Sequence, residues 1–452
     1  MAVFPNNFVW GAALAAYQIE GGAKDGGRGP SIWDSFCRIP GKIERGETGD
    51  VACDSYHRWA DDVAALKAMG LKAYRFSIAW PRIIPDGDGA VNPEGLAYYD
   101  KLVDALLENG IEPYVTLYHW DLPLALEEKG GWQNIDTARA FERYAAILAE
   151  HFRGRVHSWL TVNEIACVVN LGYGTGTHAP GLQLPLEGQF RCWQHVIYAH
   201  CLAERALHAA DGANRVGFVS TGRLCYPVSE DPRDVEAARA LTFGSPDDDW
   251  GFTHQMSLDP LCLGHWPREN VGPRLAACFR EVPQEITDAL AFGKPDMIGL
   301  NIYNAIPARM GEQGPEYAPR PVGYPCTALG WPVEPESLNW GPYFIHQRYG
   351  LPLYITENGQ SCDDRIFLDG KVHDPDRIDF LARYLKALSQ GIARGADIRG
   401  YFHWALLDNF EWYSGYNQRF GLYFVDYPTG QRIPKDSSFW YAETVAKNGA
   451  NL

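Results

Sequence analysis

Several patterns that mark common protein classes are missing from this chain of 452 residues. The ten cysteines include no CxxC spacing, so neither a zinc ribbon nor a redox dithiol is indicated. Neither GxGxxG nor GxxxxGK[ST] occurs, which argues against a doubly wound nucleotide-binding fold. HExxH is missing as well. We therefore expect no metal and no cofactor.

Basic side chains are also in short supply. The chain has 40 Lys and Arg against 56 Asp and Glu, a formal net charge of −16, and no basic cluster. This balance argues against nucleic acid or an anionic membrane surface as a partner. The apolar stretch at residues 8–16 is too short to span a bilayer, and no Lys or Arg precedes it as in a signal peptide. Scattered cysteines are typical of free thiols in a reducing compartment, so we expect a cytoplasmic protein.

What the chain does contain is a regular alternation of short apolar runs with longer segments of helical period. Gly70, Gly110, Gly154 and Gly395 each follow an amphipathic run, where a helix cap is expected. The predicted strands are 8–17, 73–80, 113–120, 158–163, 215–220, 297–303, 353–356 and 400–406. Predicted helices include 55–69, 95–109, 137–152, 193–210 and 377–394. Eight such units predict a single (β/α)₈ TIM barrel domain over residues 1–452.

A barrel of this kind holds its chemistry at the C-terminal ends of the strands. Two carboxylates, Glu164 and Glu357, follow the fourth and seventh predicted strands, each beside an Asn. Glycosidic bond cleavage needs such a pair, one group to protonate the leaving oxygen and one to attack or to activate water. The alternative is that both are ordinary solvated loop carboxylates.

Six ordered segments show a resemblance over nearly the whole chain. They are FVWG at residues 8–11, AYQIEG at 16–21, YRFSIAW at 74–80, TVNE at 161–164, ITENG at 355–359 and FGL at 420–422. Together they resemble glycoside hydrolase family 1, the β-glucosidase family. The resemblance implies a retaining mechanism, with Glu164 as general acid/base and Glu357 as nucleophile.

Further roles follow from the same resemblance. Arg75 would lie beside Glu357, Tyr303 would donate a hydrogen bond to it, and Asn163 would hold the sugar 2-hydroxyl. Arg75 could instead form a structural salt bridge, His119 could be a core histidine, and Trp331 could simply be packing. The implied contacts to the non-reducing sugar, the glycone, are Gln18, His119, Trp404, Glu411 and Trp412, and Trp331 would be the platform for the leaving group, the aglycone.

Three positions refine the expected substrate. Glu411 stands where the 6-phospho-glycosidases of the family carry Ser, so a non-phosphorylated sugar is implied. Ile165 and Ala166 replace the Pro and Trp that usually follow the acid/base Glu. We expect the small Ala166 side chain to widen the entrance to the cleft.

The sequence therefore predicts a β-glucosidase that takes a β-glucoside or cello-oligosaccharide and releases glucose. A β-galactosidase, β-fucosidase or transglycosylase is the alternative within the family. A catalytically inert sugar-binding domain is the alternative from another class. The sequence leaves a homo-oligomer open.

Overall fold

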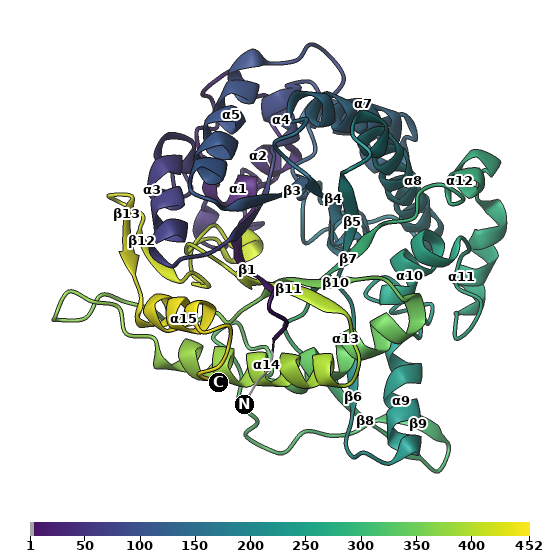
Figure 1. The fold of residues 1–452 in the computed structure, drawn as a ribbon. Coiled ribbons are helices and arrows are strands. Elements are labelled where there is room, and N and C mark those ends of the chain that lie inside the picture. The colour runs from purple at the N-terminus through teal and green to yellow at the C-terminus, as the bar shows by residue number, and fades with distance from the viewer. Residues whose placement is uncertain (1–3) are drawn as a thin grey trace.

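Eight parallel strands form a closed barrel in the computed structural model, which describes residues 4–452 (Figure 1). The strands are β1 (Val9–Ala13), β2 (Ala73–Ser77), β3 (Glu112–Tyr118), β4 (Ser158–Asn163), β5 (Arg215–Ser220), β7 (Met297–Asn301), β10 (Leu353–Asn358) and β11 (Ile398–Trp404). Their order around the barrel is β1-β11-β10-β7-β5-β4-β3-β2, and β1 pairs with both β11 and β2. The predicted TIM barrel is confirmed.

Helices cover the outside of the barrel (Figure 1). The longer ones are α3 (Ser55–Ala68), α5 (Pro93–Glu108), α7 (Asp136–His151), α8 (Leu186–Ala210), α9 (Pro232–Thr242), α13 (Glu336–Tyr349), α14 (Pro375–Ala393) and α15 (Asp436–Ala446). In α7, Phe141, Tyr144 and Leu148 are fully buried because they share one face at helical spacing. Gly70 follows the C-terminal end of α3 and has φ of +68°, the left-handed conformation expected of a cap glycine.

The strands are apolar on nearly every position because both of their faces are covered. Every residue of β2, β4, β7 and β10 is buried. The first predicted strand, 8–17, was too long. The strand ends at Ala13, and the chain turns into the short helix α1 (Ala16–Ile19), whose first backbone N–H donates to Ser77 Oγ at 2.7 Å.

Several smaller elements were not predicted. Beside α9 lies a three-stranded sheet of β6 (Cys225–Pro227), β8 (Ile306–Gly311) and β9 (Gly314–Tyr317), and β12 (Tyr423–Asp426) pairs with β13 (Gln431–Pro434). A π-helical segment, Cys167–Thr175, follows β4. The short helices are α2 (Ile32–Phe36), α4 (Trp80–Ile83), α6 (Leu124–Glu127), α10 (His254–Leu258), α11 (Pro273–Cys278) and α12 (Gln284–Ala289).

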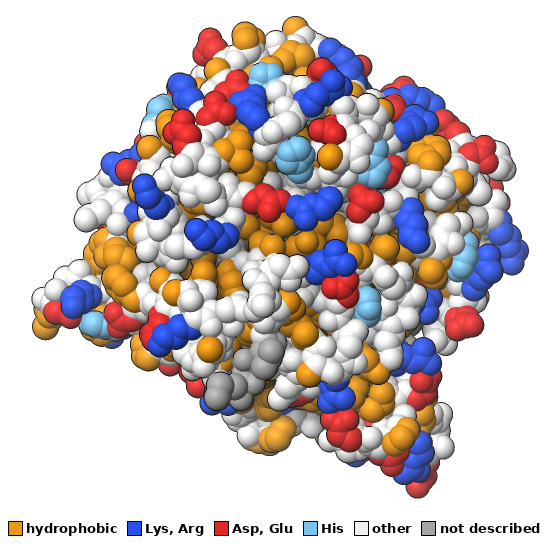
Figure 2. Space-filling view, in the orientation of Figure 1, with side chains coloured by type: hydrophobic (Ala, Val, Ile, Leu, Met, Phe, Trp, Pro, Cys, Tyr) orange, Lys and Arg blue, Asp and Glu red, His pale blue; other side chains and the backbone are white. Residues whose placement is uncertain are grey.

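The surface agrees with the charge pattern of the sequence. On the face in view, Lys and Arg are interspersed with Asp and Glu (Figure 2). All ten cysteines are free thiols, and eight of them are buried. Among the helices of residues 4–452, none combines the length and the hydrophobicity needed to cross a membrane.

Candidate active site

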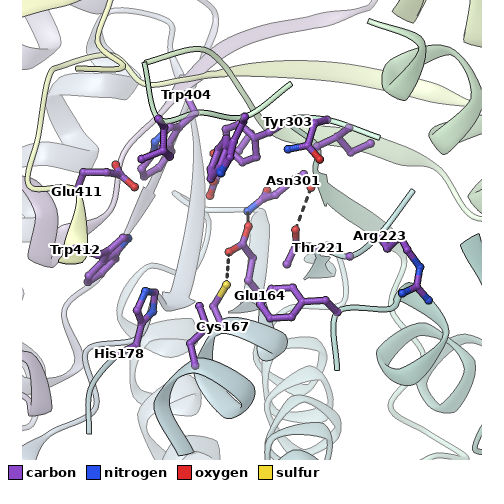
Figure 3. Close-up of a pocket in the computed structure, with 18 of the residues that line it drawn as sticks. Glu164, Cys167, His178, Thr221, Arg223, Asn301, Tyr303, Trp404, Glu411 and Trp412 are labelled. Carbon is purple, nitrogen blue, oxygen red and sulfur yellow. Dashed lines mark hydrogen bonds between the residues drawn. The ribbon is translucent and has the colours of Figure 1, made fainter. Parts of the chain in front are cut away.

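A cavity of about 600 Å³ opens where the barrel strands end. In Figure 3, Glu164 lies between Cys167 and Asn301, with Glu411, Trp404 and Trp412 on one side of it and Thr221 and Arg223 on the other. Most of the predicted site residues line this cavity: His119, Glu164, Tyr303, Trp331, Glu357, Trp404, Glu411 and Trp412. Gln18, Arg75 and Asn163 are buried and contact residues that line it.

The Glu357 carboxylate is held by two donors at the end of β10. Arg75 Nη1 donates to Oε1 at 2.6 Å, and the Tyr303 hydroxyl donates to Oε2 at 2.7 Å. Burial raises the pKa of Glu357, while the Arg75 charge and the Tyr303 hydrogen bond act in the opposite direction. Each carboxylate oxygen therefore has a partner that favours its ionised form.

The Glu164 carboxyl has neutral hydrogen-bond partners instead. Asn301 Nδ2 donates to Oε1 at 2.7 Å, and Cys167 Sγ donates to Oε2 at 3.2 Å. Burial, followed by the negative charge of Glu357, raises the pKa of Glu164 to about 7. The Glu164 backbone has φ of +49°, a strained conformation for a non-glycine residue that costs about 1–3 kcal/mol. The two carboxyl groups thus share one cavity but differ in the charge of their hydrogen-bond partners.

Asn163, the last residue of β4, connects Arg75 to His119. Its Oδ1 accepts from Arg75 Nη2 at 2.6 Å and from Asn301 Nδ2 at 3.1 Å, so its Nδ2 faces His119 Nε2 at 3.2 Å. Burial, with a smaller effect of Arg75, keeps the pKa of His119 well below its usual value. The neutral ring accepts at Nε2, and its Nδ1 has no partner among residues 4–452. His119 therefore has an unused Nδ1–H donor.

Glu411 contributes a third carboxyl group to the cavity. Burial, and then the charges of Glu357 and Glu164, raise the pKa of Glu411 to about 8. Gln18 lies behind it, with Nε2 donating to Asn409 Oδ1 at 2.9 Å and to the Phe410 carbonyl at 2.8 Å. The Gln18 Oε1 atom is buried without a partner in the described chain. Gln18 thus holds the loop that carries Glu411 and keeps one acceptor unused.

Aromatic rings form the wall next to Glu411. The Trp404 and Trp412 rings lie 6.0 and 6.1 Å from the His119 ring and are nearly parallel to it, at 15° and 14°. Trp120 packs against Trp412 with ring centroids 4.5 Å apart. Flat apolar faces of this kind cover the C–H face of a sugar ring, while the carboxyl and imidazole groups meet its hydroxyls.

Apolar side chains line the same cavity: Leu171, Leu224, Phe252, Ile306, Leu329 and Trp331. The Trp331 ring lies 5.0 Å from the Tyr303 ring, on a segment outside the barrel strands. Arg223 lies on the side of Glu164 away from Glu411 (Figure 3). It is paired with Asp249 and also donates to the Gly244 carbonyl at 2.7 Å.

Two residues at the centre of the site were not selected from the sequence. Asn301 ends β7 and reaches both Asn163 and Glu164, and Cys167 contacts Glu164 from the π-helical segment. The position of Asn301 at the end of a predicted strand could have identified it as a site residue. Nothing in the sequence pattern distinguished Cys167 from the other cysteines.

The expected position of Ala166 at the entrance to the cleft was wrong. Ala166 is 1% exposed and packs in the core, whereas its neighbour Cys167 lines the cavity. The backbone N–H of Cys167 donates to the Glu164 carbonyl at 3.0 Å. This turn places the third residue after Glu164 beside its carboxyl group and directs the second one away. The Ala166 side chain therefore does not line the cavity.

Within residues 4–452, no group of three or more His, Cys, Asp or Glu side chains is arranged to hold a metal ion. The carboxyl groups that line the cavity can transfer protons and attack as nucleophiles, and the other side chains can hydrogen-bond and stack.

Comparisons with known proteins agree over the full length. Residues 1–450 match the family model described as glycosyl hydrolase family 1. Beta-glucosidase A of Thermotoga maritima is 41% identical over 453 residues, covering 99% of this chain and 98% of the relative. A bifunctional beta-D-glucosidase/beta-D-fucosidase of Bifidobacterium breve is 40% identical, with 99% of both chains covered. The solved structure of the Thermotoga maritima beta-glucosidase in complex with glucoimidazole superposes with a TM-score of 0.88, at 40% identity and covering 99% of this chain and 100% of that one.

Proposed function

The chain belongs to glycosyl hydrolase family 1 and is a β-glucosidase, and we propose that Glu164 and Glu357 carry out its reaction with retention of configuration. The observation that carries this assignment is the contrast between the two carboxyl groups in one cavity. Glu357 contacts a cation and a hydroxyl donor, whereas Glu164 has neutral partners and a pKa near 7. Such a division of environments is what an acid and a nucleophile need.

In the first step, Glu164 donates its proton to the glycosidic oxygen as the bond from that oxygen to C1 breaks. An oxygen of Glu357 bonds to C1 and forms the glycosyl-enzyme. In the second step, water attacks C1 and gives its proton to Glu164, and the bond to Glu357 breaks. Two inversions at C1 give net retention. The Arg75 and Tyr303 contacts hold Glu357 for this attack.

We propose that the end of the cavity around Glu411 takes a terminal, non-phosphorylated glucosyl residue. Glu411 and the unused atoms Gln18 Oε1 and His119 Nδ1 offer complementary acceptors and a donor for hydroxyl groups. A phosphate dianion would meet an acidic group there and be disfavoured. Asn163 would contact the 2-hydroxyl, and Trp404 and Trp412 would cover the sugar face.

The leaving group would lie against the apolar side chains that line the cavity, with Trp331 as its platform. This favours aryl and alkyl β-glucosides together with short cello-oligosaccharides, and a role in cellulose breakdown would follow from the latter. A second candidate glycone is β-D-fucose, because the Bifidobacterium breve relative at 40% identity is a bifunctional beta-D-glucosidase/beta-D-fucosidase. Fucose lacks the 6-hydroxyl, so Glu411 would have one hydroxyl group fewer to bind.

The test is hydrolysis of 4-nitrophenyl β-glucoside with product analysis by ¹H NMR. We expect β-glucose as the first product, followed by slow mutarotation, and no release of nitrophenol above background by Glu357→Gln. Appearance of α-glucose first would contradict retention. Activity of Glu357→Gln equal to that of the parent would contradict the assigned nucleophile.

We also propose that residues 1–452 act as one domain in the cytoplasm. Ten free cysteines support a reducing compartment, because an oxidising one would tend to pair or modify exposed thiols such as Cys326. Cell fractionation with antibody detection tests the location.

A further inference from the structure

A thiol lies directly beside the proposed acid/base. The Sγ atom of Cys167 is 3.2 Å from Glu164 Oε2 (Figure 3). Cys167 lines the cavity and is 8% exposed. The turn that joins the Cys167 backbone N–H to the Glu164 carbonyl, at 3.0 Å, fixes the two side chains on the same side.

The two oxygens of Glu164 have partners of unequal strength. Oε1 accepts from Asn301 Nδ2 at 2.7 Å, and Asn301 is itself fixed because its Oδ1 accepts from Thr356 Oγ1 at 2.7 Å. Oε2 has the thiol, which is a weaker donor than an amide. Since Oε1 is tied to a rigid amide, Oε2 is the oxygen that can carry a proton to the leaving group.

The thiol can act in this contact only as a donor when Glu164 is ionised, because a carboxylate only accepts. Burial, followed by the charge of Glu164, raises the pKa of Cys167 well above its usual value, so the S–H group persists at neutral pH. A donor to the ionised form of an acid favours that form.

Building on the proposed function, we propose that Cys167 is a positioning residue that holds Glu164 Oε2 and stabilises the carboxylate formed when the leaving group is protonated. In the first step the proton passes from Oε2 to the glycosidic oxygen, the bond from that oxygen to C1 breaks, and Glu357 bonds to C1. The S–H group then donates to Oε2. It does so until water attacks C1, the bond to Glu357 breaks, and the water proton returns to Oε2.

The first test is the pH profile of kcat/KM for an aryl β-glucoside with a poor leaving group, whose alkaline limb reports the protonated acid of the free enzyme. In Cys167→Ala the ionised form loses a donor, so the alkaline limb should move up by about 0.5–1 pH unit. Cys167→Ser retains a donor and should bring the limb back toward the parent. Leu171→Ala is the matched control, because Leu171 lines the same cavity and lies in the same π-helical segment. The KM of Leu171→Ala is free to change, but the alkaline limb of its kcat/KM profile should stay at the pH of the parent.

An alkaline limb of Cys167→Ala that stays within about 0.2 pH unit of the parent overturns the proposal, as does an equal shift in Leu171→Ala. In either case the parent still hydrolyses the glucoside, so the proposed function stands. A parent protein that does not hydrolyse the glucoside would instead contradict the proposed function.

A second test needs no turnover. The S–H stretching band of Cys167 can be identified in the infrared spectrum as the band that Cys167→Ser lacks. It should shift to lower frequency as the pH rises through about 7, because Glu164 then ionises and accepts a stronger hydrogen bond. A band that keeps its frequency over this range overturns the proposal.

Discussion

The Arg75 guanidinium and the Glu357 carboxylate form an ion pair of 2.6 Å inside the barrel, with side-chain exposures of 1% and 5%. Arg75 also donates to Thr116 Oγ1 at 3.2 Å, to Asn163 Oδ1 at 2.6 Å and to the Thr356 carbonyl at 3.1 Å. One side chain on β2 thus contacts β3, β4 and β10. The same group that stabilises the charge of Glu357 also fixes the strand ends around it.

Replacing Arg75 should therefore change both the pH profile and the stability. In Arg75→Gln the charge of Glu357 is no longer offset, so the pKa of Glu357 rises and the acid limb of kcat/KM moves to higher pH. The free energy of unfolding should fall by about 3–5 kcal/mol, because a buried carboxylate loses its partner. Profiles of pH against rate and urea unfolding measure the two effects.

The control for Arg75 is Arg348→Gln. Arg348 pairs with the buried Asp259 at 2.6 Å, outside the residues that line the cavity. It should destabilise the protein without moving the acid limb. If the acid limb of kcat/KM stays in place in Arg75→Gln, then Arg75 does not lower the pKa of Glu357.

Removal of the Glu357 carboxylate should abolish turnover but leave room for an external nucleophile. In Glu357→Gly, azide or formate should restore cleavage of activated aryl glucosides, and azide should give the α-glucosyl azide, because one inversion replaces two. NMR of the product shows the configuration. A β-glucosyl azide, or rescue at the same rate in a Glu164→Gly variant that yields α-azide, would contradict the assignment of the two residues.

The Glu164→Gln variant should discriminate between substrates by their leaving groups. Departure of a poor leaving group needs a proton, so kcat/KM for an alkyl glucoside should fall far more than for 2,4-dinitrophenyl β-glucoside, with a difference of about 10²-fold or more. The parent should lose activity as the pH rises through about 7, where Glu164 ionises. The variant should lose this alkaline limb with the activated substrate. Equal losses on both substrates would count against an acid role.

Much of this site could be predicted because its residues lie at strand ends. The limits of β4 and β5 match the predicted 158–163 and 215–220, since continuous apolar runs there stop at polar residues. Glu164 directly follows β4 and Glu357 lies at the end of β10, so the barrel brings them together. Gln18 was expected directly after a first strand of residues 8–17, whereas it lies on α1, after the chain has left the barrel.

The remaining site features depend on the conformation of the turn after β4. Glu164 has φ of +49°, and a π-helical segment follows it. No residue pattern in the sequence predicts either feature. This turn decides that Cys167 faces the cavity and Ala166 the core. Likewise, Asn301 could be placed at the end of β7 but not in contact with Glu164, because that contact depends on the register between strands distant in sequence.

Glu411 should make the stability of the protein depend on pH. Its pKa is about 8 in the folded state and about 4.3 when exposed in the unfolded chain. The unfolded state loses this proton first, so the contribution of Glu411 is greatest below pH about 4 and is lost as the pH rises through about 8. Glu411→Gln, which does not titrate, should therefore gain stability relative to the parent between pH 4 and 8, on the order of 5 kcal/mol for a pKa difference of roughly 3.7 units. A difference in urea unfolding free energy that is constant over this range would contradict the raised pKa.

The last prediction concerns Ala166, which is buried in the core instead of lining the entrance. Ala166→Trp forces an indole into packed space, so it should lower the free energy of unfolding by about 1–3 kcal/mol or more. It should leave the ratio of kcat/KM for bulky and small aglycones within about twofold of the parent, since no cavity contact is added directly. Leu171→Trp is the matched comparison, because Leu171 lines the cavity and is partly exposed. It should alter that ratio with a smaller loss of stability. If Ala166→Trp changes the ratio as much as Leu171→Trp does while remaining as stable as the parent, its side chain reaches the entrance after all.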